Sequence, residues 1–241
     1  MVKKLVVLIL TILLSALALA AAGDGPPAMT PEESAKVQAV VVKMSEVQKD
    51  LRSLRVNFVQ TNQFQMLKDP QVLKGQLLLE KPDRALYRYT SPSPLVFLIK
   101  EGTLLVYDPK QKQAFVQDIR RHQDRIFRYL GVGQPMDELV KHFTVIWVDE
   151  KDGVAHVQLV PLKSRVKRKL ATLHFWVDIK TGLPSAFEVV EPEGDRIRFD
   201  FRDWEVNPDL GPKAFEVTIP NGVKVQRQLS DLTDPFKPSG E

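Results

Sequence analysis

The sequence contains no cysteine. A lipid-modified export signal needs a cysteine at its cleavage site, so we do not expect the chain to be a lipoprotein itself. The absence also excludes disulfide bonds and thiolate metal ligands. Stability must therefore come from an ordinary apolar core.

Motifs for catalysis and for metal binding are also missing. The four histidines are scattered, with no His-x-His or His-Glu-x-x-His spacing, so we expect no metal site and no cofactor. The sequence has no Gly-x-Ser-x-Gly elbow, no P-loop and no Gly-x-Gly-x-x-Gly run. We therefore do not expect an enzyme. A hydrolase with a site of dispersed carboxylates is an alternative that activity screens would test.

A long apolar run occurs only at the N-terminus. Lys3 and Lys4 precede an apolar stretch that ends in small residues near Ala20 and Ala22, which is typical of a secretory signal. We predict a signal peptide over residues 1–22, cleaved after Ala20 or Ala22, and export to the periplasm. An uncleaved membrane anchor is the alternative, because the run is close to the minimum that spans a bilayer.

The formal net charge is +4. Basic residues gather between Arg120 and Arg128 and between Lys163 and Lys169. These clusters suit an anionic membrane or an acidic partner, but a solvated surface is the simpler explanation for most of these charges. Export excludes nucleic acid as a partner.

A helix is predicted after a linker at residues 23–29. Thr30 can cap it, Pro31 suits its first position, and Glu33 completes a capping box. Apolar residues then recur at three- and four-residue spacing, which predicts one face turned to a core: Val37, Val40, Val41, Met44, Val47, Leu51 and Leu54.

From Val56 onward the apolar pattern has the period of β-strands. We predict about eleven strands joined by short turns, with a helical insertion between the sixth and seventh. Such an antiparallel meander is expected to curl into a barrel or half-barrel, with the first helix on its concave side. The fold class is thus mainly β with helices (α+β), in one monomeric domain at residues 30–228 before a loose tail at 229–241. The pattern leaves open whether the interior is a packed core or an apolar cavity.

Short motifs along the chain resemble those of the periplasmic lipoprotein carrier family, the LolA-like proteins. The resemblance covers about Val37 to Val225 and is carried by the order and spacing of several pieces: Phe58-Val59-Gln60, Lys81-Pro82-Asp83-Arg84, Tyr87 with Tyr89, Tyr107-Asp108-Pro109, Thr181-Gly182-Leu183-Pro184, Asn207 with Leu210, and Pro220-Asn221-Gly222.

The resemblance implies an unclosed antiparallel half-barrel with a helical lid. It further implies a chaperone that binds the acyl chains of lipoproteins. Such a carrier takes them from an ABC-type release complex in the inner membrane to an outer-membrane receptor. Two positions depart from the family. Lys81 stands where the family has an arginine before the turn proline, and Leu86 stands where an arginine is frequent. Lysine keeps the charge but lacks the bidentate fork of a guanidinium.

Apolar side chains on the strands and the lid are the predicted ligand-binding residues, with Lys81 and Pro82 at the turn beside the lid. Those expected on the concave face are Phe58, Leu77, Leu79, Tyr87, Tyr89, Phe97, Ile99, Leu105 and Tyr107. Those expected from the lid and the later strands are Phe127, Leu130, Met136, Leu139, Phe175, Phe187, Phe199 and Phe201.

Two other functions fit the same fold. One is the carriage of a different lipid. The other is a lipid-sensing periplasmic regulator that binds an anti-sigma factor. Such regulators usually carry a second C-terminal domain, for which we expect no room after Val225.

Overall fold

A computed structural model describes residues 29–121 and 140–226 of the chain. Several predictions lie outside the described residues: the signal peptide, residues 23–28 of the linker, the helical insertion at 122–139 with Phe127, Leu130, Met136 and Leu139, and the tail at 229–241.

The first described helix, α2, spans Pro31–Asp50. The predicted capping box is confirmed: the Glu33 amide donates to Thr30 Oγ1 at 3.2 Å, and the Thr30 amide donates to Glu33 Oε2 at 2.7 Å. The predicted apolar stripe is buried at Val37, Val40 and Met44.

The helix ends earlier than its apolar stripe predicts, because Asn207 caps the junction that follows. Asn207 Oδ1 accepts hydrogen bonds from the amides of Arg52 at 2.7 Å and Ser53 at 3.2 Å, while its Nδ2 donates to the Asp50 carbonyl at 3.0 Å. The expectation that Leu54 continues the helix is therefore wrong. Leu54 belongs to the first strand, where it pairs with Leu79.

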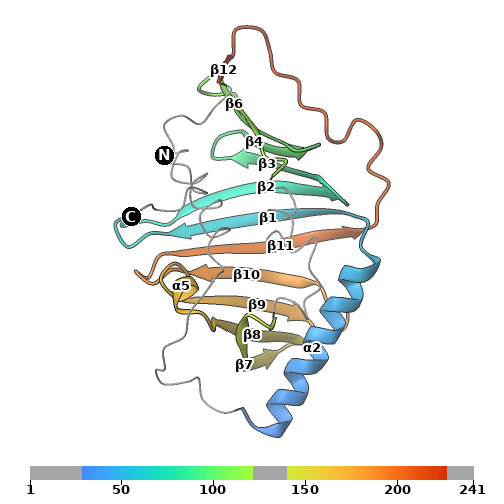
Figure 1. Cartoon of the computed structure of the whole chain (residues 1–241), viewed down its shortest axis with the longest axis vertical. Coiled ribbons are helices and arrows are strands. Elements are labelled where there is room, and N and C mark those ends of the chain that lie inside the picture. The colour runs from blue at the N-terminus through green and yellow to red at the C-terminus, as the bar shows by residue number, and fades with distance from the viewer. Residues whose placement is uncertain (1–28, 122–139, 227–241) are drawn as a thin grey trace.

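The strands form one open sheet of twelve, in the order β12-β6-β5-β4-β3-β2-β1-β11-β10-β9-β8-β7 (Figure 1). Neighbours are antiparallel except β12, which is parallel to β6. Because β7 and β12 end the described sheet and do not pair with each other, the predicted unclosed half-barrel is confirmed, with β12 as an additional strand. The strands are β1 Ser53–Gln63, β2 Gln71–Glu80, β3 Arg84–Ser91, β4 Leu95–Lys100, β5 Thr103–Asp108, β6 Gln113–Asp118, β7 Phe143–Lys151, β8 Val154–Pro161, β9 Thr172–Asp178, β10 Pro184–Val190, β11 Arg196–Val206 and β12 Lys224–Gln226, and a short helix α5 (Ser164–Lys167) links β8 to β9.

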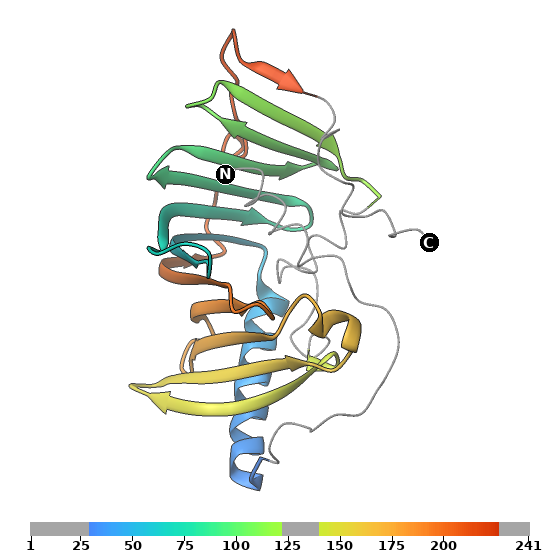
Figure 2. The same ribbon diagram turned by 90° about the vertical axis from the view of Figure 1, so that its left-hand side faces the viewer.

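Helix α2 covers one face of the sheet at the β7–β10 end. We call this the inner face. Val40 and Met44 of α2 pack with Val157 of β8, Leu173 of β9 and Val189 of β10 in one buried cluster. Both views show α2 beside the β7–β10 end and away from the β3–β6 end (Figure 2).

The opposite, outer face is covered at the other end of the sheet. Residues 207–223, here the C-terminal strap, run from β11 to β12 (Figure 1). Phe215 of the strap is 3% exposed and packs with Leu78 of β2, Leu86 of β3 and Leu98 of β4. Two elements therefore cover opposite faces at opposite ends of one sheet.

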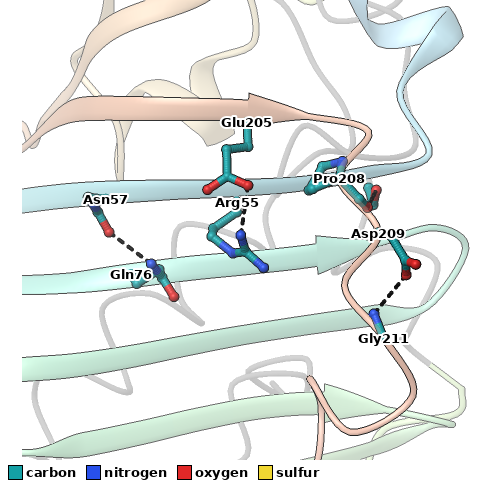
Figure 3. A network of polar contacts seen from close by, with 8 residues as sticks. Arg55, Asn57, Gln76, Glu205, Pro208, Asp209 and Gly211 are labelled. Carbon is teal, nitrogen blue, oxygen red and sulfur yellow. Dashed lines mark hydrogen bonds and ion pairs between the residues drawn. The ribbon is translucent and has the colours of Figure 1, made fainter.

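The middle of the outer face is polar. Arg55 Nη1 of β1 lies 2.7 Å from Glu205 Oε2 of β11, and Gln76 Nε2 of β2 donates to Asn57 Oδ1 at 3.0 Å (Figure 3). This polar surface contrasts with the apolar side chains on the inner face of the same strands.

Candidate functional site

The central strands place a row of apolar side chains on the inner face. Phe58 of β1 pairs with Phe201 of β11 on one side and with Gly75 of β2 on the other. Gly75 in turn pairs with Tyr89 of β3, which pairs with Leu95 of β4. Because paired residues share a face of the sheet, this row runs across five adjacent strands on one side.

Gly75 makes room for the ring of Phe58. A Cβ atom at Gly75 would lie 2.7 Å from Phe58 Cζ and 2.5 Å from the Arg88 carbonyl oxygen. Real Cβ contacts are not this short, so only glycine lets the ring cross β2 here. The Phe58 ring consequently approaches Tyr89 of β3, with the two ring centroids 5.2 Å apart.

Six aromatic rings form a cluster on this face. The Phe58 ring centroid lies 5.2 Å from that of Tyr89, 6.1 Å from that of Tyr87 and 5.6 Å from that of Phe199, each in an edge-on geometry. Edge-on geometries of this kind are favourable for pairs of aromatic rings. The aromatic cluster consists of Phe58, Tyr87, Tyr89, Phe97, Phe199 and Phe201.

The structure brings most of the predicted residues together. Those in the inner-face apolar cluster around the aromatic rings are Phe58, Leu77, Leu79, Tyr87, Tyr89, Phe97, Ile99, Phe199 and Phe201. Phe175 and Phe187 also lie on the inner face, with ring centroids 4.9 Å apart, but they belong to the cluster beneath α2. That these residues bind a ligand stays a prediction.

The placement predicted for Leu105 and Tyr107 is wrong. The tight turn between β4 and β5 pairs Lys100 with Thr103, so the inward positions of β5 are Leu104 and Val106. Leu105 and Tyr107 therefore point to the outer face, where they pack in the cluster beneath the strap.

Several inner-face residues were not predicted. Trp204 packs against the aromatic cluster and donates from Nε1 to the Pro184 carbonyl at 3.1 Å. Gln60 and Asn62 of β1 lie on the same face as Phe58. Their spacing of two residues from Phe58 could have predicted this placement. Other members of the cluster that were not predicted as site residues include Leu73, Leu104, Val106 and Phe115.

A chain of three buried polar side chains crosses this apolar face. Tyr89 Oη donates to Gln60 Oε1 at 2.7 Å, and Gln60 Nε2 donates to Asn62 Oδ1 at 2.8 Å. Gln60 is 0%, Asn62 1% and Tyr89 2% exposed. Burial raises the pKa of Tyr89 well above its ordinary value, so the phenol stays neutral. The face therefore carries neutral hydrogen-bonding groups among hydrocarbon.

Lys81 and Pro82 lie in the turn between β2 and β3, as predicted. Lys81 Nζ donates to the Gln48 carbonyl in the last turn of α2 at 2.7 Å. Burial lowers the pKa of the Lys81 ammonium. The turn is thereby tied to the end of the helix, beside the inner face.

A hollow opens on the other side of the sheet. It has a volume of about 480 Å³, is open to solvent, and is lined by Asn57, Lys74, Gln76, Arg88 and Arg202 among others. These five residues are polar or charged, while Phe58, Val59 and Gly75 also line the hollow. The hollow therefore adjoins the aromatic cluster at Phe58, on the same central strands.

Within residues 29–121 and 140–226, no group of three or more acidic or histidine side chains could hold a metal ion. No helix in this described part of the chain is long and apolar enough to cross a membrane. The described inner face thus presents apolar contact area and neutral hydrogen-bonding groups.

Comparison with known proteins gives a consistent result. A family model described as "Outer membrane lipoprotein carrier protein LolA" matches residues 49–218, more than half of the chain. The chain is 25% identical over 154 residues to the outer-membrane lipoprotein carrier protein of Cupriavidus necator, covering 64% of this chain and 70% of that protein. It is 23% identical over 185 residues to the protein of the same name from Dechloromonas aromatica, covering 77% and 86%.

Among solved structures, an uncharacterized conserved protein from Thermus thermophilus has a similar fold. The TM-score is 0.52 at 9% sequence identity, and the match covers 80% of this chain and 99% of that chain. At this identity the similarity concerns the fold alone.

Proposed function

Because the chain belongs to the family of outer membrane lipoprotein carrier proteins, LolA, we propose that it is a periplasmic carrier of lipoproteins. It binds their acyl chains on the aromatic inner face and ferries them from the inner to the outer membrane. The role is non-enzymatic. The proposed partners are an ABC-type release complex that loads the carrier and an outer-membrane receptor that unloads it.

The observation that carries the proposal is the aromatic cluster at the middle of the inner face. Among the described residues, the long helix α2 packs over the β7–β10 end and leaves the cluster outside its contacts. Tyr87, Phe97, Phe199 and Phe201 remain half-buried there. Half-buried rings gathered on one face supply apolar area that an acyl chain can cover.

The free energy of burying an acyl chain suits a carrier that other proteins load and empty. Burial of an acyl chain contributes about 0.8 kcal/mol for each methylene. A long fatty chain is therefore worth on the order of 10 kcal/mol, which a carrier must shield without holding the cargo irreversibly. Loading then needs an external energy source, and release needs a receptor that binds the chain more tightly.

The direct test is to identify what the protein carries. The protein would be exported with its own signal, purified from the periplasm without detergent, and its bound molecules extracted for mass spectrometry. We expect acylated lipoprotein to co-purify, and purified protein to keep an acylated lipoprotein soluble but not its deacylated form. Absence of acylated species in both experiments would overturn the proposal. Recovery of a free lipid alone would indicate a lipid carrier instead.

A further inference from the structure

We propose that Asn62 recognises the polar linkage of a bound acyl chain, by donating a hydrogen bond from its side-chain amide to an ester or amide carbonyl. The inference rests on the proposed carrier function and specifies the ligand class: acyl chains attached through a carbonyl, in preference to plain hydrocarbon or ether-linked chains.

The first argument is an unpaired donor in a buried place. Asn62 is 1% exposed, and its Nδ2 has no hydrogen-bond partner in the described part of the chain. Its Oδ1 is already used, since it accepts from Gln60 Nε2 at 2.8 Å. A buried donor without a partner is destabilising, and such groups are rare in folded proteins. A ligand carbonyl would satisfy it.

The second argument is that Asn62 keeps one unpaired polar atom in either orientation of the two amides. If both side-chain amides are turned end for end, Gln60 donates to Tyr89 and Asn62 donates to Gln60. The three-membered chain is then preserved and Asn62 Oδ1 becomes the unpaired atom. An ester carbonyl satisfies the first orientation, and an amide linkage, with both C=O and N–H, satisfies either.

The third argument is position. Asn62 lies on β1 between Ile197 of β11 and Gln71 of β2, four residues along the strand from Phe58 and on the same face. At the rise of a β-strand the separation is about 13 Å. A chain whose linkage meets Asn62 can therefore run along β1 over the aromatic cluster around Phe58.

Two lipids that differ only in the carbonyl test the inference. The purified protein would be titrated calorimetrically with palmitoyl-lysophosphatidylcholine and with its ether-linked analogue, both below their micelle concentrations. One extra hydrogen bond predicts that the ester binds about three- to tenfold more tightly than the ether.

Two variants locate the preference. Asn62→Leu removes both polar atoms at similar volume and is expected to reduce the ester-to-ether ratio to about one. Thr61→Val changes the neighbouring residue of β1, which has the opposite parity and lies on the outer face. It keeps the Asn62 amide, so it should retain the preference. Asn62→Ala serves in place of Asn62→Leu if the latter does not fold.

Equal affinity of wild-type protein for the two lipids, or a preference retained without the Asn62 amide, would overturn the role of Asn62 and leave the carrier function standing. Failure of both lipids to bind wild-type protein would count against the carrier function as well.

Discussion

Lys81 and Gln48 join the β2–β3 turn to the C-terminal end of α2, through a hydrogen bond of 2.7 Å from Nζ to the main-chain carbonyl. A cation at this end of a helix is favoured by the exposed carbonyls and by the helix dipole. Lys81, at the position where the resemblance implies an arginine, thus bonds to a backbone carbonyl in α2.

The Lys81→Met variant should be less stable than wild-type protein. It keeps the aliphatic stem but loses the hydrogen bond, and we expect the free energy of unfolding to fall by about 1–2 kcal/mol. Lys81→Arg is the matched control, because a guanidinium can also donate to the Gln48 carbonyl. Urea denaturation would measure both. An unchanged free energy of unfolding in Lys81→Met would show that the hydrogen bond contributes nothing to stability.

The Gly75→Ala variant should be destabilised by about 1–3 kcal/mol, because the added methyl collides with the Phe58 ring and with the Arg88 backbone. Gly153→Ala provides a comparison without a collision: nothing lies within 4 Å of its Cβ position, but its φ of 75° is strained for alanine. It should cost about 1 kcal/mol. Thermal melts would contradict the packing argument if the order were reversed.

The Phe201→Gln variant should weaken acyl-chain binding about tenfold or more, because it places an amide among the aromatic rings. Arg202→Gln introduces the same side chain at the next position of β11, where it is exposed beside the outer hollow, and should bind normally. Binding of a fluorescent fatty acid would measure both variants. Equal losses in the two would argue against the inner face as the binding surface.

The Phe215→Ala variant should lower the free energy of unfolding by about 3 kcal/mol, because Phe215 is the buried anchor of the strap. Val217→Ala, at a half-buried strap position, should cost about 1 kcal/mol. Chemical denaturation would compare them. Similar small losses would mean that the strap contributes little to stability.

Stability should fall as the pH drops from about 6.5 to about 4, because of a histidine pair on the outer face. His156 Nε2 lies 3.0 Å from His174 Nδ1. Burial, then the neighbouring His156, Arg196 and Arg198, lowers the pKa of His174 to about 4 from an ordinary value of 6.5. The unfolded chain therefore binds protons first as the pH falls, and protonation favours unfolding.

The charged neighbours of the pair are mixed. Asp149 lies 3.8 Å from His156 and opposes the lowering of its pKa, as does Glu188, while Arg198 adds to it. Denaturation of wild-type protein and His174→Gln at several pH values would isolate the contribution of His174. The variant should lose less stability between pH 6.5 and pH 4. If the stability of both proteins fell equally between pH 6.5 and pH 4, His174 would not be the cause of the loss.

The sequence predicted the fold where one signal dominated. Thr30 and Glu33 marked the helix start because capping is local. Phe97 and Ile99 lie on the predicted face because they pair with Tyr87 and Ala85 of β3, and paired residues share a face of the sheet. Leu105 and Tyr107 were misplaced because β5 is apolar on both faces, since the strap covers the outer one. Where both faces are buried, alternation carries no information about direction.

The strap and the polar chain were harder to predict. Phe215, Val217 and Ile219 alternate as strand residues do, yet residues 214–219 form no strand in the structure. The local pattern therefore does not show which face of the sheet they cover. Gln60 was visible as part of a family motif, but its bonds to Tyr89 and Asn62 depend on pairing between distant strands. Asn207 likewise caps a junction more than 150 residues earlier in the chain, which no local pattern reveals.

The placement of α2 and the strap at opposite ends and on opposite sides has a mechanical consequence. Helix α2 packs on one end of the sheet and the strap packs on the other. Neither contact depends on a ligand being bound at the aromatic cluster between them. When a ligand leaves the aromatic cluster, α2 and the strap keep their contacts with the sheet. In the proposed carrier role, release of a bound acyl chain then leaves both supporting contacts of the sheet intact.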